Sequence, residues 1–316
     1  MTDELAGKVA IVTGGGSGIG EALCRELGRR GARVIVADIN GSEATRVAAA
    51  ITGHGGRAGA STVDVAQEQD ITHLVEETAA THGRLDYLFN NAGIVIAGEA
   101  RYLTPAHWRQ VLAVDLDGVL HGTLAAYPVM ARQGFGHIVN TASADAIFPH
   151  PANAPYSTAK HAVVGLSLSL RLEAADLGVK VSCVCPGFVR TNIYQNMVLV
   201  NPNLPAGVPR EQLAGAPAKT MEPARAAQVI LGGVARNQAL IVFPATIRWA
   251  RRLYSLSPRL IERQILRQFR QRRQRYQAAA PDSPKPGQHP GPADSASAQL
   301  IRGGLDGLPA DPTGLN

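Results

Sequence analysis

The chain has 316 residues, of which 45% are hydrophobic, and a formal net charge of +6 at pH 7. This length is enough for one large domain with a sizeable core, plus a tail. No run of 18 apolar residues and no signal-peptide pattern occurs, which excludes a membrane-spanning helix and leads us to expect a cytoplasmic protein. Three cysteines, Cys24, Cys183 and Cys185, make no disulfide framework. Without clustered histidines they also argue against a zinc site, so no bound metal is expected.

The positive charge is concentrated near the C-terminus. Residues 1–245 carry 19 basic and 20 acidic side chains, whereas residues 246–277 carry ten arginines and one glutamate. Residues 278–316 carry two basic and four acidic side chains. The high overall pI therefore describes one short segment and not the long region before it.

Apolar runs rich in β-branched residues alternate with helical patterns through the first 245 residues. Strands are expected at residues 9–12, 34–37, 85–89, 137–141, 179–184 and 240–243, with a weaker one at 59–64. Alternating strands and helices predict an α/β fold, a Rossmann-like doubly wound parallel sheet with helices on both faces.

The first strand runs into a glycine-rich turn, T-G-G-G-S-G-I-G, at residues 13–20. A helical pattern follows, and then a second apolar run that ends at Asp38. In this context Gly14, Gly18 and Gly20 permit a tight turn, close approach to a pyrophosphate and close helix–strand packing. The pyrophosphate would face the helix N-terminus. A glycine turn without a ligand is the alternative, and the strand–turn–helix–strand context disfavours it.

Asp38 lies eighteen residues after Gly20. A carboxylate at this point can accept hydrogen bonds from both adenosine ribose hydroxyls and would repel a 2′-phosphate. Ser17 and Ile39 offer no cation to hold such a phosphate, so the sequence predicts NAD rather than NADP. Asp38 is also suited to begin the next turn, and the two roles are compatible.

Tyr156 and Lys160 are four residues apart in Y-S-T-A-K, and Ser143 lies thirteen residues before the tyrosine. The i, i+4 spacing places the phenol and the ammonium on one helix face. An ammonium beside a phenol favours the phenolate, which makes Tyr156 a candidate general acid or base. Ser143 would hold the substrate oxygen. The pair alone also suits an ordinary surface contact, and the dinucleotide motif decides against that interpretation.

Over residues 5–245 the chain resembles the classical short-chain dehydrogenase/reductase family. The motifs that carry the resemblance are the glycine turn, N-N-A-G at 90–93, P-G-x-x-x-T at 186–191, and the serine, tyrosine and lysine. The resemblance implies a homo-oligomer, either a dimer or a tetramer. It also implies a set of residues that bind NAD: Gly14, Ser17, Gly18, Ile19, Gly20, Asp38, Ile39, Asp64, Val65, Asn91, Ala92, Gly93, Tyr156, Lys160, Pro186, Gly187, Val189 and Thr191.

The family mechanism gives each catalytic residue a role. Tyr156 would exchange the proton with the substrate oxygen, and Ser143 would orient that oxygen. Lys160 would bind the nicotinamide ribose and lower the pKa of Tyr156. This predicts hydride transfer between NAD and a secondary alcohol or ketone. A catalytically silent nucleotide-sensing or scaffold protein is the alternative from another class, and a dehydratase or epimerase on the same fold is a third.

Asp115 is a departure from the family pattern, because an asparagine usually stands at this position and helps to hold a water beside the lysine. Aspartate is nearly isosteric but lacks the N–H donor and carries a charge. Asp115 is therefore a candidate catalytic residue acting on Lys160. The alternative is that aspartate is tolerated at this position and has no special role.

Substrate specificity is expected between residues 191 and 220, whose proline and asparagine content argues against one regular helix. We predict that this lid and the region around Ser143 line an apolar pocket for a small-molecule secondary alcohol or ketone of cyclic or aromatic shape, with Asp145 as a polar exception. The alternative is that these side chains pack on the protein itself. The expected lining is Ile193, Tyr194, Met197, Val198, Leu199, Ala144, Ile147, Phe148 and Phe188.

Residues 246–277 form a basic extension, in which a helix is expected at 258–276. Its predicted apolar face consists of Ile261, Ile265, Leu266, Phe269 and Tyr276. This face would pack on the domain before it or lie on an anionic membrane surface. Nucleic acid is not an expected partner, because aromatic residues are not interleaved with the basic ones. Residues 278–316 are rich in proline, glycine and serine and are expected to be disordered.

Overall fold

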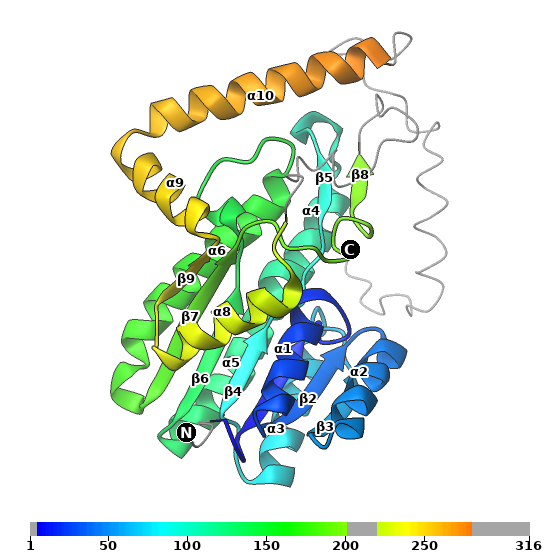
Figure 1. Cartoon of the computed structure of the whole chain (residues 1–316), viewed down its shortest axis with the longest axis vertical. Helices are drawn as coiled ribbons and strands as arrows, with labels where there is room; N and C mark the ends of the chain where they lie inside the picture. The colour runs from blue at the N-terminus through cyan, green and yellow to red at the C-terminus, as the bar shows by residue number, and fades with distance from the viewer. Residues whose placement is uncertain (1–4, 201–219, 280–316) are drawn as a thin grey trace, which may run out of the picture.

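Seven parallel strands form the central sheet of the computed structural model, which describes residues 5–200 and 220–279 (Figure 1). Their order across the sheet is β3-β2-β1-β4-β6-β7-β9. The strands are β1 (Val9–Thr13), β2 (Arg33–Asp38), β3 (Arg57–Thr62), β4 (Tyr87–Asn90), β6 (Gly136–Thr141), β7 (Val179–Pro186) and β9 (Leu240–Phe243). The order reverses direction between β1 and β4, which creates a crevice at their carboxyl ends where such folds bind ligands.

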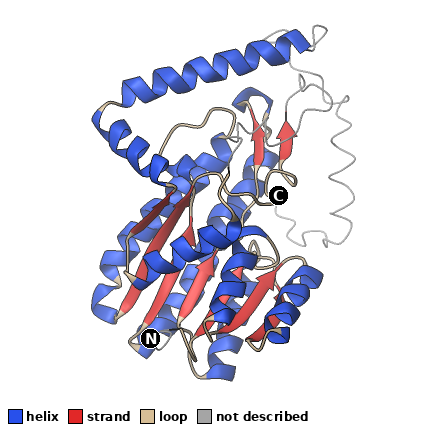
Figure 2. Ribbon diagram, in the orientation of Figure 1, coloured by secondary structure: helices blue, strands red, loops and turns tan. Residues whose placement is uncertain are grey.

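Helices cover both faces of the sheet (Figure 2). One apolar core lies under α1 (Gly18–Arg29), α2 (Gly41–Gly53) and α8 (Pro223–Ala235). The other face packs against α3 (Glu68–His82), α5 (Gly118–Gln133) and α6 (Ala154–Glu173). All five residues of β1 are buried, as expected for a strand covered on both faces. The predicted Rossmann-like doubly wound parallel fold is confirmed.

Most predicted strand bounds differ from the observed ones by one or two residues, and two of these differences involve an acidic side chain. The strand expected at 85–89 is β4, which begins at Tyr87, directly after the buried Asp86. Its carboxylate accepts a hydrogen bond of 2.9 Å from the backbone N–H of Val9 and pairs with Arg84. The weak strand expected at 59–64 is β3, which ends at Thr62 and leaves Asp64 in the following loop.

Several short elements surround the carboxyl end of the sheet. β5 (Ile96–Gly98) pairs in parallel with β8 (Val198–Val200), a small ribbon that the sequence did not predict. It ties the first part of the expected lid to the chain after N-N-A-G, whereas residues 201–219 lie outside the described residues. The other short elements near this end are η1 (Ala100–Tyr102), α4 (Pro105–Leu112), the π-helical turn η2 (Ala113–Asp117) and η3 (Ala144–Ala146), whereas η4 (Ala175–Leu177) precedes β7 at the opposite end.

The basic extension forms two helices, α9 (Ala245–Leu256) and α10 (Pro258–Ala279). α10 crosses the top of the molecule beyond the carboxyl ends of the strands (Figure 1). It continues to Ala279, so the boundary predicted at 277/278 falls inside the helix, and residues 280–316 lie outside the described part. Ile261, Ile265 and Phe269 are half-buried on its inner side, but Leu266, expected on the same face, is exposed. No helix in the described ranges is long and apolar enough to cross a membrane.

Candidate active site

The glycine turn between β1 and α1 is closely packed against neighbouring backbone. Gly14 has a φ of +62°, in the left-handed region that favours glycine. A Cβ on Gly20 would lie 2.0 Å from the carbonyl oxygen of Gly14, so no other residue fits there without a shift of the turn. Ser17 precedes α1 and makes no side-chain capping hydrogen bond to the first turn. Backbone N–H groups at this helix end are therefore suited to bind a pyrophosphate.

Asp38 ends β2 beside the glycine turn. Its Oδ2 accepts a hydrogen bond of 2.9 Å from the backbone N–H of Gly16, and its Oδ1 accepts one of 2.9 Å from that of Asn40. The carboxylate thus stabilises two turns, which agrees with the turn-forming role that the sequence also predicted for Asp38. It also lines the cleft, and each carboxylate oxygen has a further lone pair for a ligand hydroxyl.

A cleft of about 360 Å³ runs along the carboxyl ends of the strands. All of the residues predicted to bind the dinucleotide line it, except Gly20, which lies under the turn. The cleft is also lined by residues that were not predicted to bind the dinucleotide: Val63, Ile94, Val95, Val114, Thr141, Ala142, Asn192, Ile193, Tyr194 and Asn196. Thr141 and Ala142 could have been predicted to line the cleft from their position at the end of β6, because ligands bind at the carboxyl ends of parallel strands.

Ser143, Tyr156 and Lys160 meet at one end of this cleft. Ser143 follows β6, and the other two residues lie on the first turns of α6. The Nζ of Lys160 lies 5.4 Å from the centroid of the Tyr156 ring and donates a hydrogen bond of 3.2 Å to the carbonyl oxygen of Thr141. Lys160 is almost fully buried. The predicted triad is therefore assembled in space.

Asp115 is fully buried in the π-helical turn and forms an ion pair with Lys160, with 2.8 Å between Oδ1 and Nζ. The angles at this contact are not those of a hydrogen bond, and Oδ1 has no hydrogen-bond donor among the described residues. Oδ2 accepts a hydrogen bond of 3.1 Å from the backbone N–H of Ile94. A Cβ at Gly93 would lie 2.7 Å from Oδ1, so a glycine is needed beside the pair. Asp115 lies behind Lys160 and does not line the cleft.

Burial raises the pKa of Tyr156 well above its ordinary value, and the carboxylates of Asp115 and Asp145 raise it further. The ring is partly accessible in the cleft, but protein atoms surround its hydroxyl, and the Ser143 hydroxyl opposes the increase. The net shift is opposite to the lowering that the resemblance implied. Asp115 pairs with the Lys160 ammonium at 2.8 Å, and its charge opposes the effect of that ammonium on the phenol. Burial also raises the pKa of Asp115, against the effect of Lys160.

A second cavity adjoins the cleft on the far side of Tyr156. The two cavities share Val95, Ser143, Tyr156, Ile193 and Tyr194. The other lining side chains of the second cavity are mostly apolar or small: Ala97, Gly98, Pro151, Ala152, Met197, Leu199 and Phe269, with Glu99, Asp145, His150, Asn153, Arg272 and Arg273 as the polar ones. Tyr156 thus stands at the boundary between the larger cleft and a smaller, largely apolar pocket.

Part of the predicted pocket lining was wrong. Ile193, Tyr194, Met197 and Leu199 line the pocket as expected, and Val198 does not, because alternate residues of β8 point to opposite sides. The residues Ala144, Ile147, Phe148 and Phe188 are also outside it. Ile147 packs on the core, the Phe148 ring contacts the ring of Tyr254 in α9, and the Phe188 ring contacts that of Tyr194.

Asp145 is the polar exception that the sequence indicated. Its carboxylate accepts a hydrogen bond of 2.6 Å from Nδ2 of Asn153, and its other oxygen lies 2.8 Å from Nδ1 of His150. Both carboxylate oxygens are therefore engaged within the pocket wall. The resulting network of three side chains supports the loop between β6 and α6.

α10 completes the pocket from outside the core region. Arg273 donates hydrogen bonds to both carboxylate oxygens of Glu99, at 3.1 Å and 2.6 Å, across 174 residues of sequence. Arg101 pairs with the same carboxylate at 3.1 Å. The guanidinium groups of Arg272 and Arg273 also lie over the ring of Phe269. Packing of this helix face on the domain was one of the two alternatives from the sequence, but its position over a pocket was not predicted.

Within the described ranges, no group of three or more histidine, cysteine, aspartate or glutamate side chains is arranged to hold a metal ion. All three cysteines are buried and unpaired. The polar groups available at the centre are therefore the serine, the tyrosine, the lysine and its aspartate partner.

Comparison with known proteins identifies the family. A family model described as short chain dehydrogenase matches residues 8–199. The chain is 35% identical over 217 residues to a cyclohexanol dehydrogenase of Acinetobacter sp., a match that covers 67% of this chain and 86% of the relative. The chain therefore belongs to the short-chain dehydrogenase/reductase family, whose members are oxidoreductases that use NAD or NADP.

Two further similarities extend this assignment. A 2,5-dichloro-2,5-cyclohexadiene-1,4-diol dehydrogenase of Sphingobium indicum is 42% identical over 199 residues, covering 61% of this chain and 76% of the relative. The crystal structure of a short chain dehydrogenase/reductase from Burkholderia phymatum in complex with NAD has a TM-score of 0.73 and 27% sequence identity. It covers 81% of this chain and 96% of that chain. The family match ends at residue 199, so α9 and α10 lie beyond it.

Proposed function

We propose that the protein transfers a hydride between NAD and an apolar, cyclic secondary alcohol or ketone, with Tyr156 as the general acid or base. The observation that carries this proposal is the position of Tyr156 between the larger cleft and the apolar pocket. A proton donor at this boundary can reach an oxygen whose carbon faces a cofactor in the cleft.

The residues of the cleft suit a dinucleotide. The glycine turn and the N-terminus of α1 would bind the pyrophosphate, and Asp38 would accept hydrogen bonds from the adenosine ribose. Thr191 and the backbone near Gly187 would hold the nicotinamide carboxamide. A Cβ on Gly18 would lie 3.0 Å from the Cβ of Thr191, so the two sides of the cleft approach closely there. When bound, the cofactor accepts or supplies the hydride.

The remaining steps belong to the side chains. Ser143 would donate a hydrogen bond to the substrate oxygen and orient it toward Tyr156. During oxidation Tyr156 would accept the hydroxyl proton, and during reduction it would donate that proton. Lys160 would bind the nicotinamide ribose, with Asp115 holding its ammonium in place. The protein thus supplies orientation and proton transfer.

The substrate is inferred from the pocket and from the relatives. Val95, Ile193, Met197, Leu199 and Phe269 surround the space beside Tyr156 with apolar groups. Two of the relatives are named for cyclohexanol and for a chlorinated cyclohexadiene diol, both ring compounds that carry a secondary hydroxyl. A spectrophotometric screen of cyclic secondary alcohols with NAD tests the proposal through the formation of NADH. Failure of every cyclic alcohol, with turnover of a linear polar one, would contradict the substrate class.

A catalytically silent nucleotide-binding protein is the second candidate, and the Asp115–Lys160 ion pair is the observation that favours it. An ammonium neutralised by a carboxylate is less able to stabilise a phenolate. Calorimetric titration with NAD separates the candidates when it is combined with the alcohol screen. Binding of NAD without turnover of any alcohol or ketone would favour the silent protein.

Replacing Asp38 with asparagine is expected to lower the preference for NAD over NADP by about tenfold or more. The amide keeps an acceptor for Gly16 but removes the negative charge that would repel a 2′-phosphate, an effect on the order of 1–3 kcal/mol. The ratio of kcat/KM with the two cofactors measures it. Glu43→Gln is the matched control, because this half-buried carboxylate lies near the same turn. An unchanged ratio in Asp38→Asn would remove the basis for predicting NAD.

Replacing Phe269 with alanine is expected to raise KM for a cyclic alcohol roughly fivefold to thirtyfold, because about 1–2 kcal/mol of apolar contact is lost. The value of kcat should change much less, since Phe269 lines the pocket away from the triad. Steady-state kinetics separate the two parameters. Phe135→Ala is the control, as this ring contacts Arg84 and does not line the pocket. Equal effects of the two substitutions would show that α10 does not contribute to substrate binding.

A further inference from the structure

The outer surface of α9 and α10 combines exposed apolar side chains with a high density of arginine. Among the described residues, eleven large apolar side chains are exposed, and five of them lie in these two helices. Four of the five, Trp249, Leu253, Leu256 and Leu260, follow one another along α9 and the start of α10 and are here called the apolar ridge. They are between 47% and 84% exposed.

The apolar ridge follows helical spacing. Trp249, Leu253 and Leu256 are four and three residues apart, so they lie on one side of α9. The inner side of α9 is attached to the body of the protein through Ile247 and Tyr254. The ridge is therefore the outward face of a helix whose other face already has partners.

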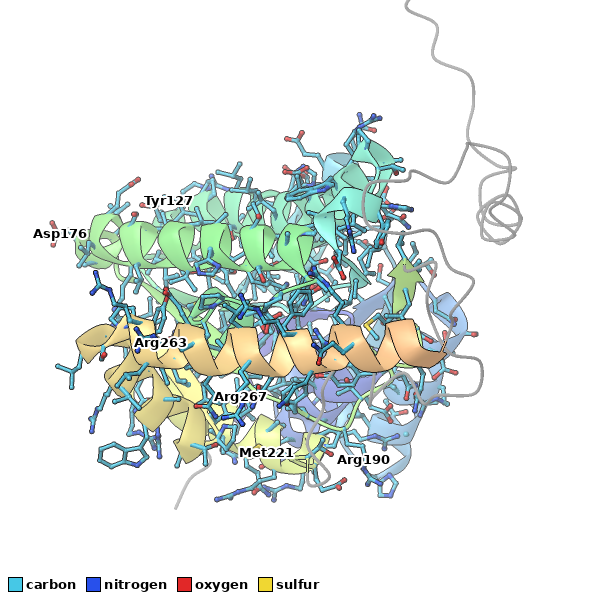
Figure 3. The ribbon with its side chains drawn as sticks, turned by 90° about the horizontal axis from the view of Figure 1, so that it is seen from above. Tyr127, Asp176, Arg190, Met221, Arg263 and Arg267 are labelled. Carbon is cyan, nitrogen blue, oxygen red and sulfur yellow. The ribbon has the colours of Figure 1, made fainter. Side chains whose placement is uncertain are left out.

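Arginines flank the ridge on both helices. Arg248, Arg252 and Arg259 are exposed beside it, and the guanidinium of Arg252 lies 5.0 Å from the centroid of the Trp249 ring. Further along α10, Arg263 and Arg267 are also exposed, and Figure 3 looks down onto this helix with both residues labelled. Glu262 is the single carboxylate of residues 246–277, and it faces the hydroxyl of Tyr254. The surface is thus strongly cationic as well as apolar.

We propose that α9 and α10 bind the surface of an anionic lipid bilayer. The ridge would enter the boundary between headgroups and acyl chains, with Trp249 at the depth that tryptophan prefers. The arginines would meet anionic headgroups, each contributing to the attraction over about a Debye length. A nucleic acid would satisfy the arginines but leave the four apolar side chains in water, so a bilayer matches the surface better.

This docking would place the substrate pocket next to the lipid. Phe269, Arg272 and Arg273 on the inner side of α10 line the pocket, while the outer side carries the exposed arginines. An apolar alcohol partitions into a bilayer, so a protein held at its surface meets a higher local concentration of such a substrate. The binding proposal does not depend on turnover, because it rests on the outer face of the helices alone.

The experiment is co-sedimentation of the full chain with lipid vesicles. Binding to vesicles of phosphatidylcholine with phosphatidylglycerol is expected to exceed binding to phosphatidylcholine alone by about tenfold or more, and to weaken as salt is added. The variants Leu256→Asp and Arg248→Gln/Arg252→Gln/Arg259→Gln are each expected to lose at least about tenfold in affinity. Leu177→Asp is the matched control, since Leu177 is 46% exposed in η4 and lies outside both helices.

Three results would overturn the proposal. One is sedimentation of Leu256→Asp and of the triple variant to the same extent as the unchanged chain. Another is equal binding to neutral and anionic vesicles. The third is tight binding of duplex DNA in a gel-shift assay without binding to vesicles. Unchanged thermal unfolding of each variant, measured by circular dichroism, verifies that a loss of binding is not a loss of fold.

Discussion

Replacing Tyr156 with phenylalanine is expected to reduce kcat/KM for alcohol oxidation by about 10²–10⁴, the usual contribution of a positioned general acid or base. The substitution removes one hydroxyl group and keeps the ring that separates the cleft from the pocket. Initial rates of NADH formation measure the change. Binding of NAD, followed by calorimetry, should be nearly unchanged, because the glycine turn and Asp38 are untouched.

Tyr194 offers an unusually close control for this experiment. Its side chain also lines both cavities, and burial also raises the pKa of its hydroxyl, with a contribution from Asp145. It lies in a turn, without a lysine four residues further on, so the proposed mechanism gives it no proton to transfer. Tyr194→Phe is therefore expected to retain most of the activity. If the two variants lost activity equally, Tyr156 would not be the proton-transferring residue.

Replacing Asp115 with asparagine is expected to shift the pH profile of alcohol oxidation toward lower pH by roughly one unit. The carboxylate of Asp115 raises the pKa of Tyr156 directly and neutralises the ammonium of Lys160. Asparagine removes both effects, so the pKa of Tyr156 falls. Oxidation requires the deprotonated tyrosine, and the rate should therefore rise with pH earlier than in the unchanged chain.

The profile of kcat/KM against pH at saturating NAD checks this prediction. Asp117→Asn is the matched control, because Asp117 lies in the same π-helical turn but makes no ion pair with Lys160. A profile of Asp115→Asn that coincides with that of the unchanged chain would mean that aspartate is simply tolerated here. A shift toward higher pH would reverse the assigned direction of the effect.

Much of the fold could be predicted because its signals are local. Each buried parallel strand is a short apolar run covered on both faces, as in β1, so its position can be read without knowing its neighbours. The glycine turn and the spacing of Tyr156 and Lys160 are equally local, since they depend on one turn and one helix. Errors arose where a strand end depends on a distant partner, as where Asp86 binds Val9 at the start of β4.

The composition of the pocket was harder to predict, because its walls come from separate segments. β8 was not foreseen as a strand, since its partner β5 lies about a hundred residues earlier, and a short strand forms only where that partner is available. This pairing decides that Leu199 faces the pocket and that Val198 does not. Phe148 is apolar and close to Ser143 in sequence, yet its ring contacts the ring of Tyr254 and does not line the pocket.

By itself the sequence determined the class of fold and the dinucleotide motif, and it indicated the candidate triad and the departure at Asp115. These features depend on residue type and on local spacing along the chain. Only the tertiary structure decided that Asp115 forms an ion pair with Lys160, that Glu99 meets Arg273, and that α10 covers the pocket. The physical reason is that charge pairing and burial depend on distances in space, and folding brings together groups that the chain separates by up to 174 residues.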